Sequence, residues 1–141
     1  MLRFYPSNIG NITHKLSVLG YSIPGAVVGV GLLIISRFKI EETDFYPFTY
    51  ANDIDAIVNK GLLYVKIKVK NNYIHLMTTH LQATYYQKKE EKLYVSYITR
   101  KTQIEELSYY IDICLKKQVK SSHDKILFMG DLNVPAGSKD N

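Results

Sequence analysis

Apolar and polar residues alternate in the middle of the chain in a way that predicts a pair of strands. Between residues 63 and 70, apolar residues alternate with one tyrosine and three lysines; the apolar positions are Leu63, Val65, Ile67 and Val69. This period of two is typical of a half-exposed strand that buries one face. Asn71-Asn72 is a two-residue turn signal, so we expect Tyr73–Thr79 to return as the partner strand.

Two more strands are predicted on either side of this hairpin. Val27–Ser36 is a continuous apolar run of the kind found in central strands, and Lys125–Met129 forms a shorter one. Phe45–Tyr50 gathers aromatic residues around a proline, where we expect a loop or an edge strand. Residues 1–25 contain several glycines and prolines and are expected to be irregular, with room for one short strand.

A single long helix is expected between the hairpin and the last strand, over Leu93–Lys117. Apolar residues recur there at helical spacing; they are Ile104, Leu107, Ile111, Cys114 and Leu115. Lys116 and Lys117 suit the negative end of the helix dipole. The order of strand, hairpin, helix and strand fits a two-layered α/β core in one domain over residues 1–141.

Composition and charge narrow the classes of protein without choosing one. The chain has 18 basic against 13 acidic residues, a net charge of +5, which favours anionic surfaces or phosphate esters but equally fits a solvated basic surface. Cys114 is the only cysteine, which excludes an internal disulfide, and we expect it in the core. No secretory signal is visible, and the most apolar segment, Ala26–Ile35, is too short at about ten residues to span a bilayer. We therefore expect a monomer that is cytoplasmic or peripherally bound to a membrane.

The most specific chemistry lies where the last strand ends, at Gly130-Asp131-Leu132-Asn133. Alternation along an extended chain would put Asp131 and Asn133 on the same side. A carboxylate can orient or deprotonate a water, and an amide can bond a phosphoryl oxygen, which together suit metal-assisted hydrolysis of a phosphate ester. Gly130 is expected to let the backbone turn tightly there. The same four residues also occur in ordinary turns, so the motif alone does not establish a catalytic site. The segments upstream are needed to distinguish the two interpretations.

Three upstream segments accompany the motif in a fixed order. They are Gly29–Ile35 with the segment Ser36–Ile40 after it, Asn59-Lys60-Gly61 before a strand, and the block Thr78-Thr79-His80-Leu81-Gln82-Ala83. With the final motif, this series resembles the endonuclease/exonuclease/phosphatase superfamily. The histidine block and the Asn-Lys-Gly strand entry are most similar to those of its neutral sphingomyelinase branch, and the resemblance covers Gly29 to Val134.

This resemblance implies a fold, an activity and roles for individual residues. The fold would be a DNase I-like four-layered α/β sandwich, with two packed sheets flanked by helices. The activity would be Mg²⁺-dependent hydrolysis of sphingomyelin to ceramide and phosphocholine. His80 would donate to a phosphoryl oxygen, Asp131 would activate or position the attacking water, and Asn133 would hold a phosphate oxygen. Arg100 and Gln103, one helical turn apart, would support the loop after the histidine.

Other candidate residues keep a second interpretation beside the functional one. Lys60 could bind an anionic substrate or be a solvated lysine at a strand start, and Asp55 could pair with it. Aromatic side chains with polar tips favour a lipid interface, but these could equally pack against the sheet; they are Phe45, Tyr46, Phe48 and Tyr50. We expect His75 at the surface, and neither His14 nor His123 has an evident partner.

The family pattern fails at both ends of the chain. Residues 1–40 contain no Asp or Glu, so the glutamate that binds the family's metal is absent and no metal ligand can be named. The last histidine, His123, precedes Asp131, so the family's final Asp-His pair is absent as well. We therefore expect a partial domain, incomplete at both ends, with exposed sheet edges and little or no activity.

Two alternatives remain open. One is another member of the superfamily acting on an inositol phosphate or, less favoured, a nucleic acid. The other is a non-catalytic remnant that keeps the fold and binds a lipid or a partner.

Overall fold

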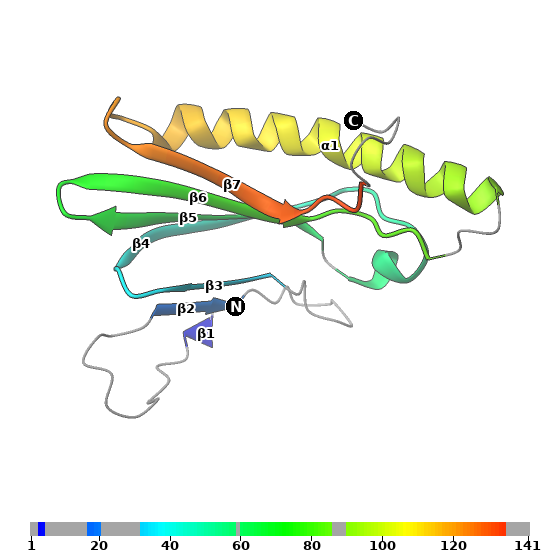
Figure 1. Ribbon diagram of the computed structural model, residues 1–141, viewed down its shortest axis with the longest axis horizontal. Helices are drawn as coiled ribbons and strands as arrows, with labels where there is room; N and C mark the ends of the chain where they lie inside the picture. The colour runs from blue at the N-terminus through cyan, green and yellow to red at the C-terminus, as the bar shows by residue number, and fades with distance from the viewer. Residues whose placement is uncertain (1–2, 5–16, 21–31, 59, 86–89, 135–141) are drawn as a thin grey trace.

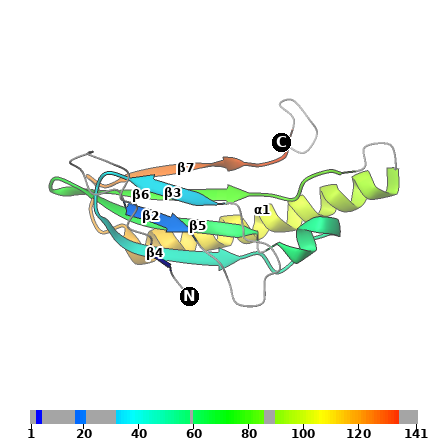
Figure 2. The same ribbon diagram turned by 90° about the horizontal axis from the view of Figure 1, so that it is seen from below.

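Four strands in the order β4-β5-β6-β7 form the main sheet of the computed structural model, which describes residues 3–4, 17–20, 32–58, 60–85 and 90–134. The strands are β4 (Ile40–Pro47), β5 (Gly61–Val69), β6 (Asn72–His80) and β7 (Lys125–Asp131). The first three pair antiparallel, and β7 lies parallel to β6. Figure 2 shows β4 and β7 along the two edges of this sheet.

The predicted hairpin is present, with its turn one residue earlier than expected. β5 ends at Val69, the turn residues are Lys70 and Asn71, and Lys70 has a φ of 56°. The strand is also more buried than a half-exposed pattern allows, because Leu62 and Tyr64 are fully buried on the face opposite Leu63. The period of two is real, but here both faces of the sheet are covered.

The two faces of the main sheet carry different layers (Figure 1). On one face lies α1 (Glu90–Gln118), and the cluster between them includes Leu62, Tyr64, Met77, Leu107 and Cys114. On the other face lies a three-stranded antiparallel sheet made of β1 (Arg3–Phe4), β2 (Ser17–Gly20) and β3 (Leu33–Ser36). Ile34 of β3 packs there with Phe45, Leu63, Val65 and Ile67. The two packed sheets of the expected four-layered sandwich are present, and the described residues include one of its two outer helical layers, α1.

The predicted helix is confirmed, although its buried stripe differs from the apolar one. Leu107 and Cys114 are buried as expected, whereas Ile104 is 39% exposed. The N-terminal half of the buried stripe is polar; its members are Ser96, Thr99, Arg100 and Gln103. α1 therefore packs on an apolar surface through one half and on polar groups through the other.

The start of the chain is described only in part. Of the predicted strand Val27–Ser36, the structure describes β3 at its end, and residues 27–31 lie outside the described residues. Most of residues 1–25 and Asn59 also lie outside them. Within the described part, no helix combines the length and apolar character needed to cross a membrane.

Candidate functional site

The parallel pairing of β6 and β7 brings two of the predicted site residues together. His80 ends β6, Asp131 ends β7, and the two are partners in the strand register. His80 Nε2 lies 3.8 Å from Asp131 Oδ2, and the two side chains are 38% and 65% exposed. An imidazole and a carboxylate therefore stand side by side at the carboxyl ends of two strands, both open to solvent.

Asn133 joins this pair by a different geometry from the one expected. The strand ends at Asp131, and Asn133 has a φ of 52°, in the left-handed region that asparagine tolerates. Its backbone N–H donates to Asp131 Oδ1 at 2.9 Å, and its Nδ2 donates to the Leu81 carbonyl oxygen at 2.9 Å. The carboxylate of Asp131 therefore meets the backbone N–H of Asn133 in a side-chain turn, and the side-chain amide of Asn133 is directed to Leu81.

Gly130 is needed for a close approach between strands rather than for a turn. It lies within β7, has a φ of 156°, and a Cβ there would meet the Thr79 carbonyl oxygen at 2.2 Å. Any other residue would push β7 away from the end of β6. The glycine of the motif therefore helps set the distance between His80 and Asp131.

Side chains of the polar half of α1 hold the segment after His80. Gln103 Oε1 accepts from the Gln82 N–H at 2.8 Å, and Gln103 Nε2 donates to the Tyr50 carbonyl oxygen at 2.9 Å. Arg100 Nη1 donates to Thr84 Oγ1 at 2.7 Å. Gln82 in turn accepts from the Asn52 N–H at 3.0 Å. These contacts place Arg100 and Gln103 where the support predicted for them would act.

A buried ion pair lies behind the same segment. Lys60 Nζ is 2.7 Å from Asp55 Oδ2, and both side chains are 3% exposed. The same carboxylate accepts from the Ala83 N–H at 2.9 Å and from the Tyr85 hydroxyl at 2.7 Å. Burial by itself would raise the pKa of Asp55, but the hydrogen bonds from Lys60, Tyr85 and Ala83 hold that pKa below its ordinary value. Asp55 is in η1 (Asp53–Ile57), so the pair ties this short helix to the loop after His80.

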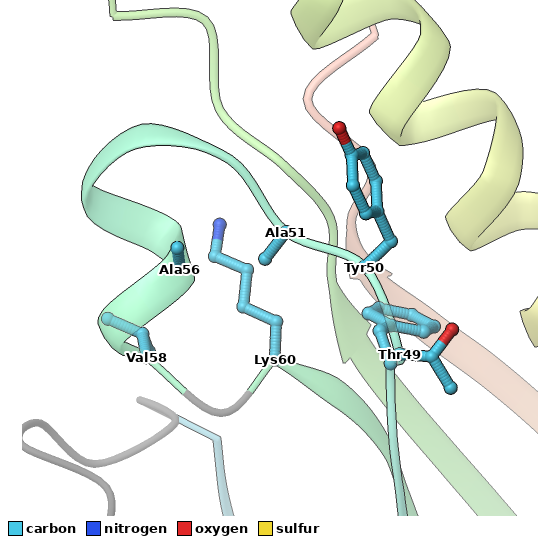
Figure 3. A pocket seen from close by; sticks show the side chains of 7 residues that line it. Thr49, Tyr50, Ala51, Ala56, Val58 and Lys60 are labelled. Atoms are coloured by element: carbon cyan, nitrogen blue, oxygen red, sulfur yellow. The ribbon is translucent and has the colours of Figure 1, made fainter.

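The interpretation of Lys60 as a solvated lysine is wrong, because its side chain is buried, whereas the predicted pairing with Asp55 is confirmed. Its ammonium group donates to the Leu81 carbonyl oxygen at 2.7 Å in addition to meeting Asp55. A pocket of about 220 Å³ lies beside it, and Figure 3 shows the lysine side chain extending between Ala51 and Ala56. The charge of Lys60 is already balanced by Asp55, so the lysine stabilises the conformation of the segment after His80.

The aromatic residues proposed for a lipid interface divide into two groups. Phe45 is 8% exposed in the core between the sheets, so the lipid role is wrong for it and the packing alternative holds. Tyr46 and Phe48 pack against the cluster under α1. Tyr50 is 49% exposed and lines the pocket beside Lys60. Tyr50 is therefore the member of the set that remains open to solvent.

His75 does not lie at the surface, contrary to the expectation. It is fully buried, its Nδ1 is 2.9 Å from the Tyr64 hydroxyl, and its Nε2 is 3.5 Å from Asp124 Oδ2. The alternation of β6 does turn His75 away from Ile74, but α1 covers the face to which it points.

Cys114 is a core residue as expected, and burial raises the pKa of its thiol to about 11.

The described residues do not make up a magnesium site on their own. Magnesium in proteins is held by carboxylate and other oxygen ligands in an octahedral arrangement. Asp131 offers one exposed carboxylate, but among the described residues no three His, Cys, Asp or Glu side chains gather as metal ligands.

The fold and the site define a mixed α/β protein that gathers polar groups at the carboxyl ends of a parallel strand pair. The chain belongs to the endonuclease/exonuclease/phosphatase family 2, whose family model matches residues 12–141. It is 32% identical over 126 residues to a sphingomyelinase from Dictyostelium discoideum, covering 77% of this chain and 27% of that protein. It is 31% identical over 140 residues to sphingomyelinase C 1 from Leptospira interrogans, covering 96% and 22%. The chain thus spans about a quarter of the length of these relatives.

Comparison with solved structures also relates this chain to sphingomyelinases and to a beta toxin. The crystal structure of SmcL superposes with a TM-score of 0.66 at 29% identity, covering 79% of this chain and 36% of that one. A Staphylococcus aureus beta toxin variant with bound magnesium ions superposes with a TM-score of 0.65 at 27% identity, covering 79% and 36%. The expected resemblance to sphingomyelinases and the fold that it implies are confirmed.

Proposed function

We propose that this chain is part of the catalytic domain of a sphingomyelinase-like phosphodiesterase, one that hydrolyses sphingomyelin to ceramide and phosphocholine. The observation that carries the proposal is the placement of His80 and Asp131, 3.8 Å apart and solvent-accessible, at the ends of paired strands. The likeness to sphingomyelinases supports the choice of substrate.

Each residue of the site has a chemical role in this proposal. The Asp131 carboxylate positions the attacking water and accepts hydrogen bonds from it. The His80 ring donates to a phosphoryl oxygen and stabilises the charge that develops there. The Asn133 amide carries two N–H donors, of which one is directed to Leu81 and the second suits a phosphoryl oxygen.

Magnesium dependence belongs to the proposal as well. The ion would neutralise charge on the phosphoryl group, which is the chemistry that it supplies in phosphoryl-transfer enzymes. The described residues supply an incomplete ligand set, so we propose that this chain alone has little or no activity. Membrane contact through the exposed Tyr50 is the corresponding proposal for a lipid substrate.

The test is hydrolysis of sphingomyelin in mixed micelles, with and without Mg²⁺, by the chain and its Asp131→Asn variant. Asp112→Asn is the matched control, because Asp112 is an exposed carboxylate on α1 paired with Lys116. Metal-dependent turnover that is lost in Asp131→Asn and kept in Asp112→Asn would support the enzyme. Turnover that survives Asp131→Asn would contradict the role of that carboxylate.

A folded chain without turnover requires a second arm. In that arm, binding of sphingomyelin vesicles is compared with binding of vesicles made of phosphatidylcholine alone. Equal binding to both, or to neither, would contradict the proposed substrate.

A further inference from the structure

We propose that Asp124, at the end of β7 remote from the site, is a positioning residue that sets the β6–β7 register and so brings Asp131 opposite His80. The importance of that placement rests on the proposed function. The argument for the register itself does not, because it rests on the contacts of β7.

The residues of β7 do not select a register by burial. Four consecutive large apolar residues fill the strand, and their exposed fractions lie between 38% and 51%; they are Ile126, Leu127, Phe128 and Met129. A strand normally resists slipping because a slip would move its apolar side chains out of the core. Since all seven residues of β7 are exposed, a slip by two positions would replace one exposed apolar side chain by another.

Asp124 supplies a contact that does depend on register. Its Oδ1 accepts from the Tyr73 N–H at 3.1 Å, and its Oδ2 lies 3.5 Å from His75 Nε2. The ring of His75 is held on its other side by the Tyr64 hydroxyl at 2.9 Å. His75 and Tyr64 are fully buried, and the Asp124 side chain is 4% exposed. The carboxylate is therefore fixed to two residues of β6, directly before the first residue of β7, and His75 connects it to Tyr64 of β5.

A change of register at this end would separate the site residues at the other. Each strand residue advances the chain by about 3.3 Å, so a slip of two residues would move Asp131 by about 7 Å along β6. That displacement exceeds the present separation of 3.8 Å between the His80 and Asp131 side chains. Near the site, Gly130 and Asn133 also favour the native register, but they belong to the motif itself. Asp124 lies outside the motif, at the other end of β7, and affects the site through the register of that strand.

Disulfide trapping measures the register directly. Thr78 and Met129 are register partners, so the pair Thr78→Cys with Met129→Cys reports the native pairing. Thr78→Cys combined with Leu127→Cys or with Asp131→Cys reports slips of two residues. These pairs have Cα atoms about 8 Å apart in the native register, too far for a disulfide. Cys114 stays in every variant because it is buried.

The measured quantity is the disulfide yield of the native pair divided by that of each slipped pair, after mild oxidation and peptide mass analysis. We expect the ratio to exceed about 10 in the native background and to fall to within about twofold of unity with Asp124→Ala. Asp124→Asn should restore most of the ratio, because its amide oxygen still accepts from the Tyr73 N–H. Asp112→Ala, which removes an exposed carboxylate on α1, should leave the ratio unchanged.

A second readout reports the site itself. The His80 ring NMR signals should shift when Asp131→Asn is introduced into the native background, because the carboxylate lies beside the ring. The same substitution should cause a clearly smaller shift in an Asp124→Ala background, because Asp131 then faces His80 in only part of the molecules. A role of Asp124 limited to overall stability would leave this dependence intact.

The outcomes separate this inference from the proposed function. An unchanged disulfide ratio in folded Asp124→Ala would overturn it, as would an equal loss in Asp112→Ala. If Asp124→Ala loses its helical circular dichroism, Asp124→Ser replaces it, since the shorter hydroxyl cannot reach both partners. Equal binding to sphingomyelin and phosphatidylcholine vesicles would count against the proposed function alone, because neither readout requires lipid binding or catalysis.

Discussion

Lys60 and Asn133 donate to the same acceptor, the carbonyl oxygen of Leu81, at 2.7 and 2.9 Å. Leu81 directly follows His80, and its own N–H donates to the Asp131 carbonyl oxygen at 2.9 Å. The segment that leaves β6 is therefore held from one side by the strand entry at Lys60 and from the other by the end of β7. The two motifs that frame the site are joined through one peptide group.

Lys60→Met should destabilise the protein strongly, because it leaves the Asp55 carboxylate buried without its cation. Loss of one partner of a buried ion pair typically costs about 3–5 kcal/mol. The control is Lys116→Met, which breaks the exposed pair with Asp112 and should cost at most about 1 kcal/mol. Urea denaturation followed by circular dichroism measures both values. Equal losses in the two variants would mean that the Lys60 pair is solvated rather than buried.

The stability of the protein should fall in acid, with Asp55 as one cause. The pKa of Asp55 in the folded protein lies below its ordinary value of 3.8, so its contribution is present above that value and is lost as the pH falls through the folded pKa. The urea midpoint should therefore drop between pH 5 and about pH 3, and Asp55→Asn should flatten this dependence. Asp124 and Glu42 also have lowered pKa values and should retain part of the slope in that variant. An identical slope in Asp55→Asn would contradict the assignment.

Gly130→Ala should loosen β7 at its site end. The added methyl group would meet the Thr79 carbonyl oxygen at 2.2 Å on a backbone with a φ of 156°, so strand and partner must move apart. A loss of about 1–3 kcal/mol is typical of such overpacking. Hydrogen exchange should accelerate at the Leu81 N–H, which donates to the Asp131 carbonyl oxygen. Met129→Ala, which shortens an exposed side chain one residue earlier, should leave that exchange rate unchanged.

Cys114 should resist thiol reagents in the folded protein. Burial raises the pKa of its thiol from 9.0 to about 11, so about a hundredfold less thiolate is present below pH 9 than in an unfolded chain. Labelling by a disulfide reagent at pH 8 should be at least that much slower in buffer than in denaturing urea. Rapid labelling of the folded protein would place Cys114 outside the core.

The chain should associate with itself through β7 at high concentration. This strand is an edge of the main sheet, and its consecutive large apolar side chains are exposed, which is a recognised route to strand-to-strand pairing. Light scattering should show association that weakens when Leu127→Lys is introduced. Tyr109→Lys is the control, because Tyr109 is also a large exposed side chain, at 63%, but lies on α1. A stronger effect of Tyr109→Lys would indicate that the chains associate through α1 rather than through β7.

The strands and the helix could be predicted because each carries a local pattern. The strand after Gly61 and the long helix that ends at Gln118 could be predicted without knowing which residues they contact. The burial of His75 and of the Lys60–Asp55 pair was not predicted, although the pairing itself was, because burial depends on layers that are distant in the sequence. His75 is covered by a helix that follows it, and the cation of Lys60 meets a carboxylate held by a loop more than twenty residues later.

The candidate site was predicted in its members more accurately than in its geometry. His80 and Asp131 are together because two strands run parallel, which the motifs alone do not state. Asn133 turns toward Asp131 through a left-handed backbone, whereas alternation assumed a strand that continues. Asp124 was missed because a lone acidic residue in a short turn gives no signal until its partners on β6 are known.

The polar half of the buried stripe on α1 has a consequence for redesign of the protein. A design that filled Ser96, Thr99, Arg100 and Gln103 with leucine would improve the helix by every measure of apolar periodicity. Leucine side chains cannot form hydrogen bonds, so the design would also remove the donor and acceptor that hold the peptide groups of Gln82 and Tyr50. Such a variant would leave these peptide groups without their partners and would loosen the segment that follows His80 at the end of β6.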